Sequence, residues 1–474
     1  MDKRMNLLLL KLGFLITDLA LVNLGYILAF VLKFGWDIPY YNFEAYISTW
    51  PWLTLSALAF FCFYRLYGSY HWRWTEVFAS LVCVVFFQAL AAMALSFFFR
   101  GFSFPRTVLL TAPFIQLALL ALWRRAAWYI ERRIQPTKRV IVAGRPLDAF
   151  ALAEKLETAT GKLMKVVGVV FDALPGPDSA PQPEQYKVGD RNPGSGSGAF
   201  NPPVLGDVED ICKVLVDVEP DEVFVCSTLS QEQKARIVHA CVDKDITVSL
   251  IPDLYEIMLA RVRLKQVDDV PVFTIGQLSI SPEYMFLKRV TDIALSLLLL
   301  LLTAPLCLLV GLAIKLDSRG PVLYRQKRLT MQGKPFYLYK FRTMVDGAEQ
   351  DSGPVLATEN DPRVTRVGRI IRATRIDEIP QLINVIKGDM SIVGPRPERP
   401  FFVNELVKEI PEYAYRMNIK SGITGLAQVF GRYSTTPENK LKYDLLYTKS
   451  YSPARDLAIL LQTIKVILTK DRAS

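Results

Sequence analysis

GRIIRATRIDEIPQLINVIKGDMSIVGPRPERP, residues 368–400, places two neighbouring carboxylates, Asp377 and Glu378, between a field of arginines and a second basic turn at Pro395-Arg396-Pro397. A carboxylate among fixed guanidinium groups suits phosphoryl transfer, because the transferred group carries spread negative charge that the protein must position and neutralise. The arginines before the pair are Arg363, Arg366, Arg369, Arg372 and Arg375.

A simpler interpretation of this stretch is a solvated helix end. Arg372 and Arg375 lie about one helical turn from the two carboxylates and could form ordinary ion pairs with them. Charge runs are usually exposed faces. The stretch alone therefore leaves both interpretations open, and the rest of the chain has to decide.

The composition indicates a membrane protein. The chain has 474 residues, enough for two to four domains, and 51% of them are hydrophobic. The net charge of +10 would suit a nucleic acid or an anionic membrane surface. We favour the membrane and expect no nucleic-acid partner, because the basic residues flank apolar spans. The six cysteines show no CxxC spacing, so the sequence indicates neither a zinc site nor a disulfide framework.

Residues 1–135 are predicted to form a bundle of four transmembrane helices, since each apolar run approaches the roughly 20 residues that a bilayer requires. The basic cluster after the fourth run places both ends of the bundle in the cytoplasm. Asp18, inside the first run and near Lys11 and Asn23, is either functional or a structural polar contact within the bundle. The four runs are residues 7–32, 47–64, 77–99 and 107–123.

Residues 136–255 are predicted to form a Rossmann-like α/β module with a parallel sheet, and residues 174–203 a flexible loop inside it. The turn after its first strand, Ala143-Gly144-Arg145-Pro146, lacks two glycines of the dinucleotide fingerprint. A regulatory, spacer or dimerising role is therefore favoured over NAD binding, and we expect a homodimer through this module. The predicted strands are residues 139–144, 166–171, 222–226 and 247–251, with a helix over 231–242.

After a linker at 256–287, residues 288–474 begin with a long apolar run that contains Pro305. Proline bends a helix, and basic residues on both flanks favour one side of the membrane for both ends. We therefore predict a re-entrant hairpin over 289–316; the alternative, a fifth full span, would export everything after Leu316. The strand expected over 336–344 carries Lys340 and Arg342, which could face an anionic ligand or lipid headgroups.

Several motifs occur in order over this third region. It is similar to the catalytic domain of the monotopic phosphoglycosyl transferases, and the whole chain resembles their long bacterial form, the polyisoprenyl-phosphate hexose-1-phosphate transferases that start capsule, O-antigen or exopolysaccharide synthesis. The matching motifs are Lys288-Arg-x-x-Asp292, Pro305, Tyr339-Lys-Phe-Arg-Thr-Met344, Asp361-Pro-Arg-Val-Thr-Arg-Val-Gly368, Asp377-Glu-Ile-Pro-Gln-Leu382, Gly388-Asp-Met-Ser-Ile-Val-Gly-Pro-Arg-Pro397 and Gly422-Ile-Thr-Gly-Leu-Ala-Gln-Val429.

The resemblance implies an α+β catalytic domain on the cytoplasmic face of the bacterial inner membrane, with a UDP-hexose and a polyprenyl (undecaprenyl) phosphate as partners. Asp377 would attack the β-phosphorus, expel UMP and hold the sugar phosphate covalently. Glu378 would be a Mg²⁺ ligand. The phosphate-binding residues would be Arg372, Arg396, Arg342 and Arg375.

Other matching positions imply support for the site. Asp292 would pair with Lys288 or Arg289 at the lipid headgroups, and Pro305 would bend the hairpin although the family's preceding serine is Ala304 here. Asp444, with Thr424 and Gln428, would belong to a substrate pocket.

Two other classes of protein remain open, a non-catalytic scaffold of polysaccharide assembly and an NAD-dependent nucleotide-sugar-modifying enzyme. The sequence does not separate glucose from galactose, because epimers differ by a few hydrogen bonds in a folded pocket.

Overall fold

The computed structural model describes most of the chain and separates it into two compact units, Met1–Tyr255 and Glu256–Ser474. All but the last two residues of the loop predicted at 174–203 lie outside the described part. The described residues are 2–67, 73–98, 104–134, 137–160, 163–173, 202–259, 263–267, 269–274, 278, 280–348, 361–431 and 435–469.

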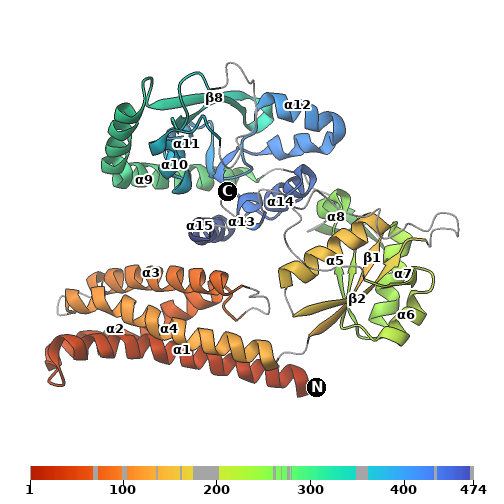
Figure 1. Cartoon of the computed structure of the whole chain (residues 1–474), viewed down its shortest axis with the longest axis horizontal. Helices are drawn as coiled ribbons and strands as arrows, with labels where there is room; N and C mark the ends of the chain where they lie inside the picture. Colours follow the sequence, from red (N-terminus) through yellow and green to blue (C-terminus); the bar gives the residue numbers. More distant parts are fainter. Residues whose placement is uncertain are drawn as a thin grey trace. The chain divides into compact units, whose positions relative to one another are not determined.

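The first unit begins with a four-helix bundle in which α1 packs against α2 and α4, and α3 against the same two helices (Figure 1). Together with α9 (Pro282–Asp317) of the second unit, these are the five helices of the described chain that are long and apolar enough to cross a membrane. The bundle helices are α1 (Asp2–Phe34), α2 (Tyr40–Phe63), α3 (Trp74–Phe98) and α4 (Arg106–Ile134).

The predicted spans 7–32 and 107–123 fall within α1 and α4, 47–64 ends one residue beyond α2, and the last residue of 77–99 lies outside the described part. Two helices extend well beyond the prediction at one end. α2 begins at Tyr40, and α4 continues about three turns beyond Trp123 into its arginine-rich end. Apolarity alone locates the part of a helix that lies in lipid, whereas the helix itself continues into polar residues that still favour helical structure.

Asp18 is a structural contact inside the bundle. Its carboxylate accepts hydrogen bonds from Nε and Nη2 of Arg124 on α4, the first at 3.1 Å, and from the hydroxyl of Tyr67 at 2.6 Å. Arg124 also donates to the carbonyl of Leu66 at 3.1 Å. A buried charge requires such compensation, so the structural alternative for Asp18 is the one that the structure supports.

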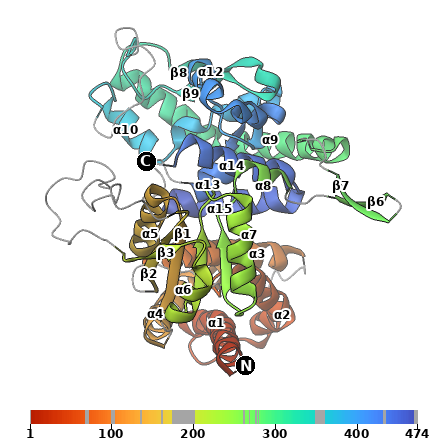
Figure 2. The same cartoon turned by 90° about the vertical axis from the view of Figure 1, so that its right-hand side faces the viewer.

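The α/β module follows, with five parallel strands in the order β3-β2-β1-β4-β5 (Figure 2). Alternate residues of β1 face opposite cores, Ile141 and Ala143 towards α6 and α7, and Val142 towards α5. The predicted parallel sheet of an α/β module is therefore present, and β3, α6 and α8 add to the predicted elements. They are β1 (Lys138–Gly144), α5 (Pro146–Thr160), β2 (Met164–Phe171), β3 (Val204–Asp207), α6 (Ile211–Val218), β4 (Glu222–Val225), α7 (Gln231–Val242), β5 (Thr247–Leu250) and α8 (Leu254–Leu259).

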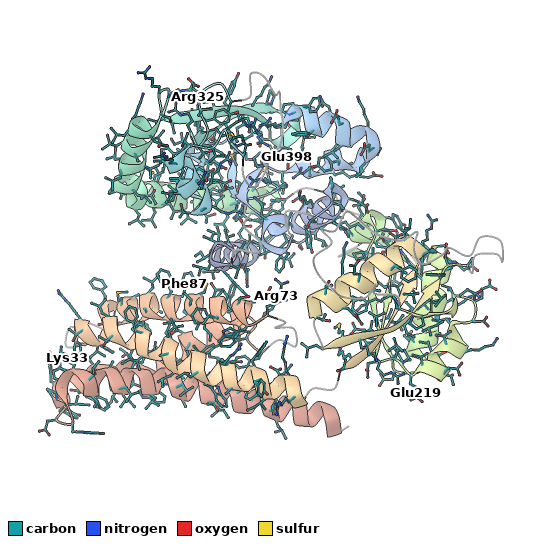
Figure 3. The ribbon with its side chains drawn as sticks, viewed as in Figure 1. Lys33, Arg73, Phe87, Glu219, Arg325 and Glu398 are labelled. Atoms are coloured by element: carbon teal, nitrogen blue, oxygen red, sulfur yellow. The ribbon has the colours of Figure 1, made fainter. Side chains whose placement is uncertain are left out.

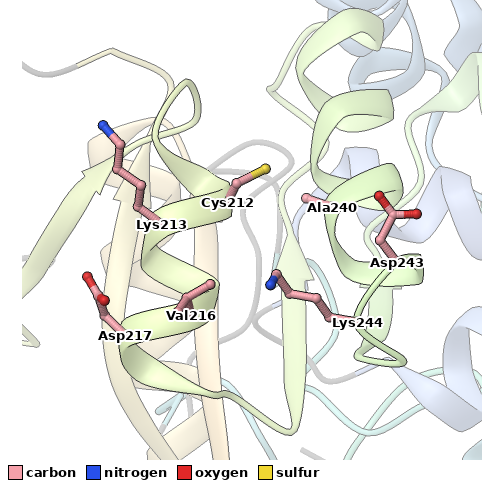
Figure 4. A pocket seen from close by; sticks show the side chains of 7 residues that line it. All are labelled: Cys212, Lys213, Val216, Asp217, Ala240, Asp243 and Lys244. Carbon is pink, nitrogen blue, oxygen red and sulfur yellow. The ribbon is translucent and has the colours of Figure 1, made fainter.

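Gly144, at the end of β1, has a packing explanation. A Cβ at this position would lie 2.7 Å from the sulfur of Cys226 on the neighbouring strand end, so the close approach of two strand ends requires glycine here. The module also has a groove of about 630 Å³ between α6 and α7, shown in Figure 4 with Lys213, Asp217 and Lys244 among its lining residues.

The second unit is an α+β domain around a small parallel pair, β10 and β11, and an antiparallel hairpin, β8 and β9. Residues 263–267 and 270–274, expected within the linker, form a further antiparallel pair of strands (Figure 2). The elements are β6 (Arg263–Val267), β7 (Val270–Thr274), α9 (Pro282–Asp317), β8 (Leu323–Leu329), η2 (Met331–Gly333), β9 (Pro335–Phe341), α10 (Arg366–Ala373), η3 (Ile376–Glu378), α11 (Gln381–Lys387), β10 (Ser391–Val393), α12 (Pro400–Glu409), η4 (Pro411–Asn418), β11 (Gly422–Thr424), α13 (Leu426–Phe430), α14 (Pro437–Lys449) and α15 (Pro453–Leu468).

Helix α9 contacts the domain at both of its ends. Near its start, Asp292 accepts hydrogen bonds from the backbone of Ile392 and the hydroxyl of Ser391 on β10. At its end, Asp317 accepts one from the backbone of Val367 on α10. Pro305 lies inside the helix, and the ribbon of α9 changes direction along its length (Figure 1).

Candidate active site

The two carboxylates lie on η3, the single 3₁₀ turn between α10 and α11. Helix α10 ends because Arg375 adopts a left-handed conformation with φ of 56°. The new turn is closed by a hydrogen bond from the Glu378 N–H to the Arg375 carbonyl at 3.2 Å. Asp377 and Glu378 therefore project from a short element whose backbone direction is set by one uncommon residue conformation.

Helix α10 lies close to the chain segment that directly follows strand β9. Thr365 caps its N-terminus by accepting from the Gly368 N–H at 2.9 Å. A Cβ on Gly368 would lie 2.1 Å from the carbonyl oxygen of Thr343. Only glycine permits this approach of the helix to residue 343.

Helix α11 is fastened to β9 by one buried amide. Asn384 accepts from the Tyr339 N–H at 3.0 Å and donates to the Tyr337 carbonyl at 2.7 Å. These two bonds satisfy backbone groups of β9 as another strand would. They also fix Lys340, the next residue of the strand, beside the carboxylates that precede α11.

Lys340 and Arg396 supply positive charge to the pair. The ammonium of Lys340 lies 2.9 Å from Oε1 of Glu378 and 3.9 Å from Oδ2 of Asp377. The Arg396 guanidinium lies 3.4 Å from the same Oε1. The carboxylate side chains are 13% and 15% exposed, whereas that of Arg396 is 44% exposed. The two carboxylates are thus largely buried, and the guanidinium side chain beside Glu378 is the more exposed partner.

The two carboxylates have opposite pKa shifts. Burial raises the pKa of Asp377 to about 6, and the charge of Glu378 adds to that rise while Lys340 opposes it. Burial also acts to raise the pKa of Glu378, but Lys340 and Arg396 outweigh it and hold that pKa at about 2. At neutral pH both groups are ionised, and Asp377 is the more basic of the two.

The other predicted phosphate-binding arginines lie at different places. Arg372 is close enough to lower the pKa of Asp377 through its charge, and its Nε donates to Thr343 Oγ1 at 2.8 Å. Arg375 contributes to the low pKa of Glu378. Arg342 is buried, and its Nη2 donates to the carbonyl and hydroxyl oxygens of Ser318, just after α9.

The residues predicted at the base of the membrane hairpin are bound to the domain core. The expected pair of Lys288 and Asp292 is present at 3.9 Å, but Lys288 lies closer, at 2.7 Å, to Asp456 on α15. Arg289 donates to the carbonyls of Val385 and Ile386 at the end of α11. The start of α9 therefore supports the helix that follows the carboxylates.

The residues expected in a substrate pocket are engaged within the fold. Asp444 is 2% exposed and pairs with Arg416 at 3.0 Å. Thr424 shares a hydrogen bond of 2.8 Å with Thr463, and the Gln428 side-chain amide donates to the Ile423 carbonyl.

Lys340 is the site residue that reasoning from the sequence missed. The sequence indicates a cation that could face an anionic ligand, but it does not place that cation with Asp377 and Glu378. Strand alternation is the signal that could have found it, because Lys340 shares its face of β9 with the buried residues Phe336 and Leu338. A lysine on an inward face needs a charged partner.

The site has two partly buried carboxylates with opposite pKa shifts and two cations beside them, and the same domain carries a long apolar helix. This combination suits a membrane-associated enzyme of phosphoryl-group transfer. Comparison with known proteins gives the particular family. Residues 283–470 match the family described as bacterial sugar transferase.

Three relatives carry the comparison further. The chain is 40% identical over 237 residues to a UDP-N-acetylgalactosamine-undecaprenyl-phosphate N-acetylgalactosaminephosphotransferase of Aeromonas hydrophila, covering 49% of this chain and 55% of the relative. It is 40% identical over 234 residues to the UDP-glucose:undecaprenyl-phosphate glucose-1-phosphate transferase of Escherichia coli K12, covering 48% and 50%.

The third relative is a UDP-glucose:undecaprenyl-phosphate glucose-1-phosphate transferase of Caulobacter vibrioides, 47% identical over 193 residues that cover 39% of this chain and 71% of the relative. The chain belongs to the bacterial sugar transferase family. It spans about half the length of the first two relatives.

Proposed function

We propose that this protein transfers a hexose-1-phosphate from a UDP-hexose to polyprenyl phosphate, with undecaprenyl phosphate as the lipid, and releases UMP. The observation that carries the proposal is the pair Asp377 and Glu378, held beside Lys340 and Arg396 in a domain whose apolar helix suits a lipid substrate. The names of the relatives support the same donor and acceptor classes.

The reaction proceeds in two displacements at one phosphorus atom. An Asp377 carboxylate oxygen forms a bond to the β-phosphorus of the donor, and the bond to the UMP oxygen breaks, so that UMP leaves with the electron pair. A phosphate oxygen of the lipid then attacks the same phosphorus and releases the carboxylate. Covalent catalysis replaces one difficult step by two easier ones.

Asp377 is better suited than Glu378 to be the nucleophile. A carboxylate with a pKa of about 6 is a stronger base than one with a pKa of about 2, and it is therefore the better electron-pair donor. Glu378 is already bound by two cations. Arg396 would bind the donor diphosphate, because its side chain is more exposed than that of Lys340.

Mg²⁺ fits the donors of this site, because it is usually held by one or two carboxylates together with substrate phosphates. Glu378 would be its main protein ligand, since its carboxylate stays ionised at every pH at which the enzyme would work. When bound, the ion would neutralise charge on the diphosphate.

The same proposal places the site at the cytoplasmic face of the bacterial inner membrane, with α9 as a re-entrant helix. Support comes from its contacts: Lys288 and Asp292 bind the domain near one end, and Val310 and Ile314 pack with Ile371 of α10 near the other. A helix that crossed the bilayer completely would separate its ends by the membrane thickness.

The test is a release assay in membranes with undecaprenyl phosphate and a panel of UDP-hexoses and UDP-N-acetylhexosamines, scored by free UMP. We expect UMP release with at least one donor and its loss in Asp377→Asn. Without acceptor, the wild-type protein should gain the mass of one sugar phosphate on the peptide that contains Asp377. Full transfer by Asp377→Asn would refute the nucleophile.

Glu378→Gln tests the metal ligand. The variant should need a higher Mg²⁺ concentration for half-maximal UMP release and should turn over more slowly, because one anionic ligand is lost. Glu405→Gln, an exposed change of the same kind on α12, is the control. Unchanged Mg²⁺ dependence in Glu378→Gln would remove this residue from the metal site.

A further inference from the structure

The turn that carries Arg396 is held almost entirely through its carbonyl groups. Pro395 and Pro397 have no N–H to donate, so these two residues can join backbone hydrogen bonds only as acceptors. Each of four successive carbonyls, 395 to 398, accepts from a different residue. The donors are Gly422 N at 2.8 Å, Arg416 Nη2 at 3.0 Å, Arg328 Nη1 at 3.0 Å and Leu329 N at 3.1 Å.

Two of these donors are guanidinium groups that are themselves fixed. The Arg416 side chain is 6% exposed and binds Asp444 through Nε at 3.1 Å, while its Nη1 donates to the Tyr413 hydroxyl. Arg328 is 17% exposed, lies 3.5 Å from Oε2 of Glu398 and donates to Gln326 Oε1. A planar guanidinium with several fixed donors orients a carbonyl better than a lysine would.

These hydrogen bonds to the turn explain how the exposed side chain of Arg396 can occupy a defined position. The side chain of Arg396 is long, and 44% of it is exposed, yet its guanidinium lies 3.4 Å from Glu378. A long side chain reaches one point reproducibly only if its backbone is fixed, because every shift of the Cα carries over to the tip. The buried pair of Asp444 and Arg416 thus acts on the site through the backbone of residue 396.

We propose that Arg416 and Arg328 are positioning residues that hold Arg396 over the donor diphosphate. Neither guanidinium needs to contact the substrate. The inference rests on the proposed function, since it assigns Arg396 to the UDP-hexose. It also gives Asp444 a role outside any substrate pocket, because this carboxylate on helix α14 keeps Arg416 oriented.

A purely structural role would also make these residues sensitive to substitution, so the test must separate the two. If Arg416 and Arg328 act through Arg396, their substitution should lower kcat/KM for UMP release only while Arg396 is present. If they only stabilise the fold, their effects should add to that of removing Arg396. Residues that act as one unit show this non-additivity in a double-mutant cycle.

The experiment measures kcat/KM for UMP release with the full-length protein in membranes, for Arg328→Gln, Arg416→Lys and Arg396→Gln, singly and in pairs. Arg325→Gln is the matched control, since Arg325 lies on the same strand β8 (Figure 3) and its guanidinium stacks 5.4 Å from the Tyr339 ring instead of binding the turn. Unfolding midpoints of the purified proteins report on the fold.

We expect Arg328→Gln and Arg416→Lys each to lower kcat/KM about tenfold or more, mainly through KM for the donor, and Arg325→Gln to leave it within about twofold. In the Arg396→Gln background the same substitutions should change kcat/KM by less than about twofold. Losses that persist in that background would overturn the inference. Should Arg416→Lys fail to fold, the Arg328→Gln cycle decides alone.

The proposed function can fail separately. If wild-type protein releases no UMP with any donor, the reaction is wrong, and the cycle is then measured on the dissociation constant for UDP with Mg²⁺. Coupling of Arg328 to Arg396 in UDP affinity would keep the positioning role. UDP affinity that is independent of both residues would remove it.

Discussion

Asp377 and Glu378 are neighbours in the chain and differ in chemistry because of what surrounds each side chain. Lys340 lies 2.9 Å from Glu378 but 3.9 Å from Asp377, and Arg396 binds Glu378. The nearer cations hold the Glu378 pKa low, whereas burial dominates at Asp377. Two carboxylates of the same charge are therefore suited to different roles, metal binding for one and bond formation for the other.

The raised pKa of Asp377 predicts an acid limb in the pH profile. Only the ionised carboxylate can attack, so the second-order rate constant of the single-turnover UMP release should fall as pH drops through about 6, and at pH 5 about one tenth of its neutral-pH value should remain. The measurement is UMP release without lipid acceptor, because the acceptor phosphate titrates in the same range. A profile that stays flat to pH 5 would contradict the raised pKa.

At this scale the sequence pointed to two carboxylates and an arginine, Arg396, that the structure brings together, because these residues form contiguous motifs. It could not assign partners across the chain. Lys340 and Glu378 are 38 positions apart in the sequence, and Arg416 and Asp444 are 28 apart. Whether such distant residues form a pair depends on how strands and helices pack. Asp444 was therefore expected in a pocket, although the structure places its carboxylate against a buried guanidinium.

At the scale of elements, the site is a 3₁₀ turn between two short helices, each fixed by polar contacts. Helix α10 is held by Thr365 and Gly368, and α11 by Asn384 and Arg289.

The β8–β9 hairpin was predictable from alternation and its Gln-Gly turn, where Gln332 and Gly333 both have positive φ. The linker hairpin β6–β7 was not, since that segment lacks a turn signal with strong flanking alternation.

Asn384→Ala tests whether α11 sets the position of Lys340. The change leaves the Tyr339 N–H and the Tyr337 carbonyl without their side-chain partner, so it should lower the unfolding free energy by about 3 kcal/mol. UMP release should fall at least tenfold if the strand moves relative to the carboxylates. Chemical denaturation and the release assay measure the two effects.

Asn439→Ala on the exposed side of α14 is the control and should be neutral in both measurements. Wild-type activity and stability in Asn384→Ala would show that β9 is positioned by other contacts.

At the scale of the whole molecule, the elements of the candidate site all belong to Glu256–Ser474, which has its own hydrophobic core. The site residues Asp377, Glu378, Lys340 and Arg396 all come from this unit. A protein that lacks residues up to Asp253 should therefore remain bound to membranes and retain measurable UMP release. Complete loss of activity in a folded, membrane-bound truncation would show that the first unit is required.

Topology gives a second prediction at this scale. In a protein without its native cysteines, Lys334→Cys at the β8–β9 turn should react with an impermeant maleimide only after the cells are opened. Trp36→Cys, in the 91% exposed position between α1 and α2, should react in intact cells or spheroplasts. Labelling of Lys334→Cys from outside would establish α9 as a complete crossing.

The ion pair of Asp18 and Arg124 has a consequence for biogenesis. The two residues are 106 positions apart, and at roughly 5 to 20 residues per second the ribosome needs about 5 to 20 s to add the second after the first. During that interval helix α1 carries an acidic group without its counter-charge. A nascent chain that stalls before Arg124 should therefore hold α1 less stably in the bundle, and we expect membrane proteases to degrade it faster than the full-length protein.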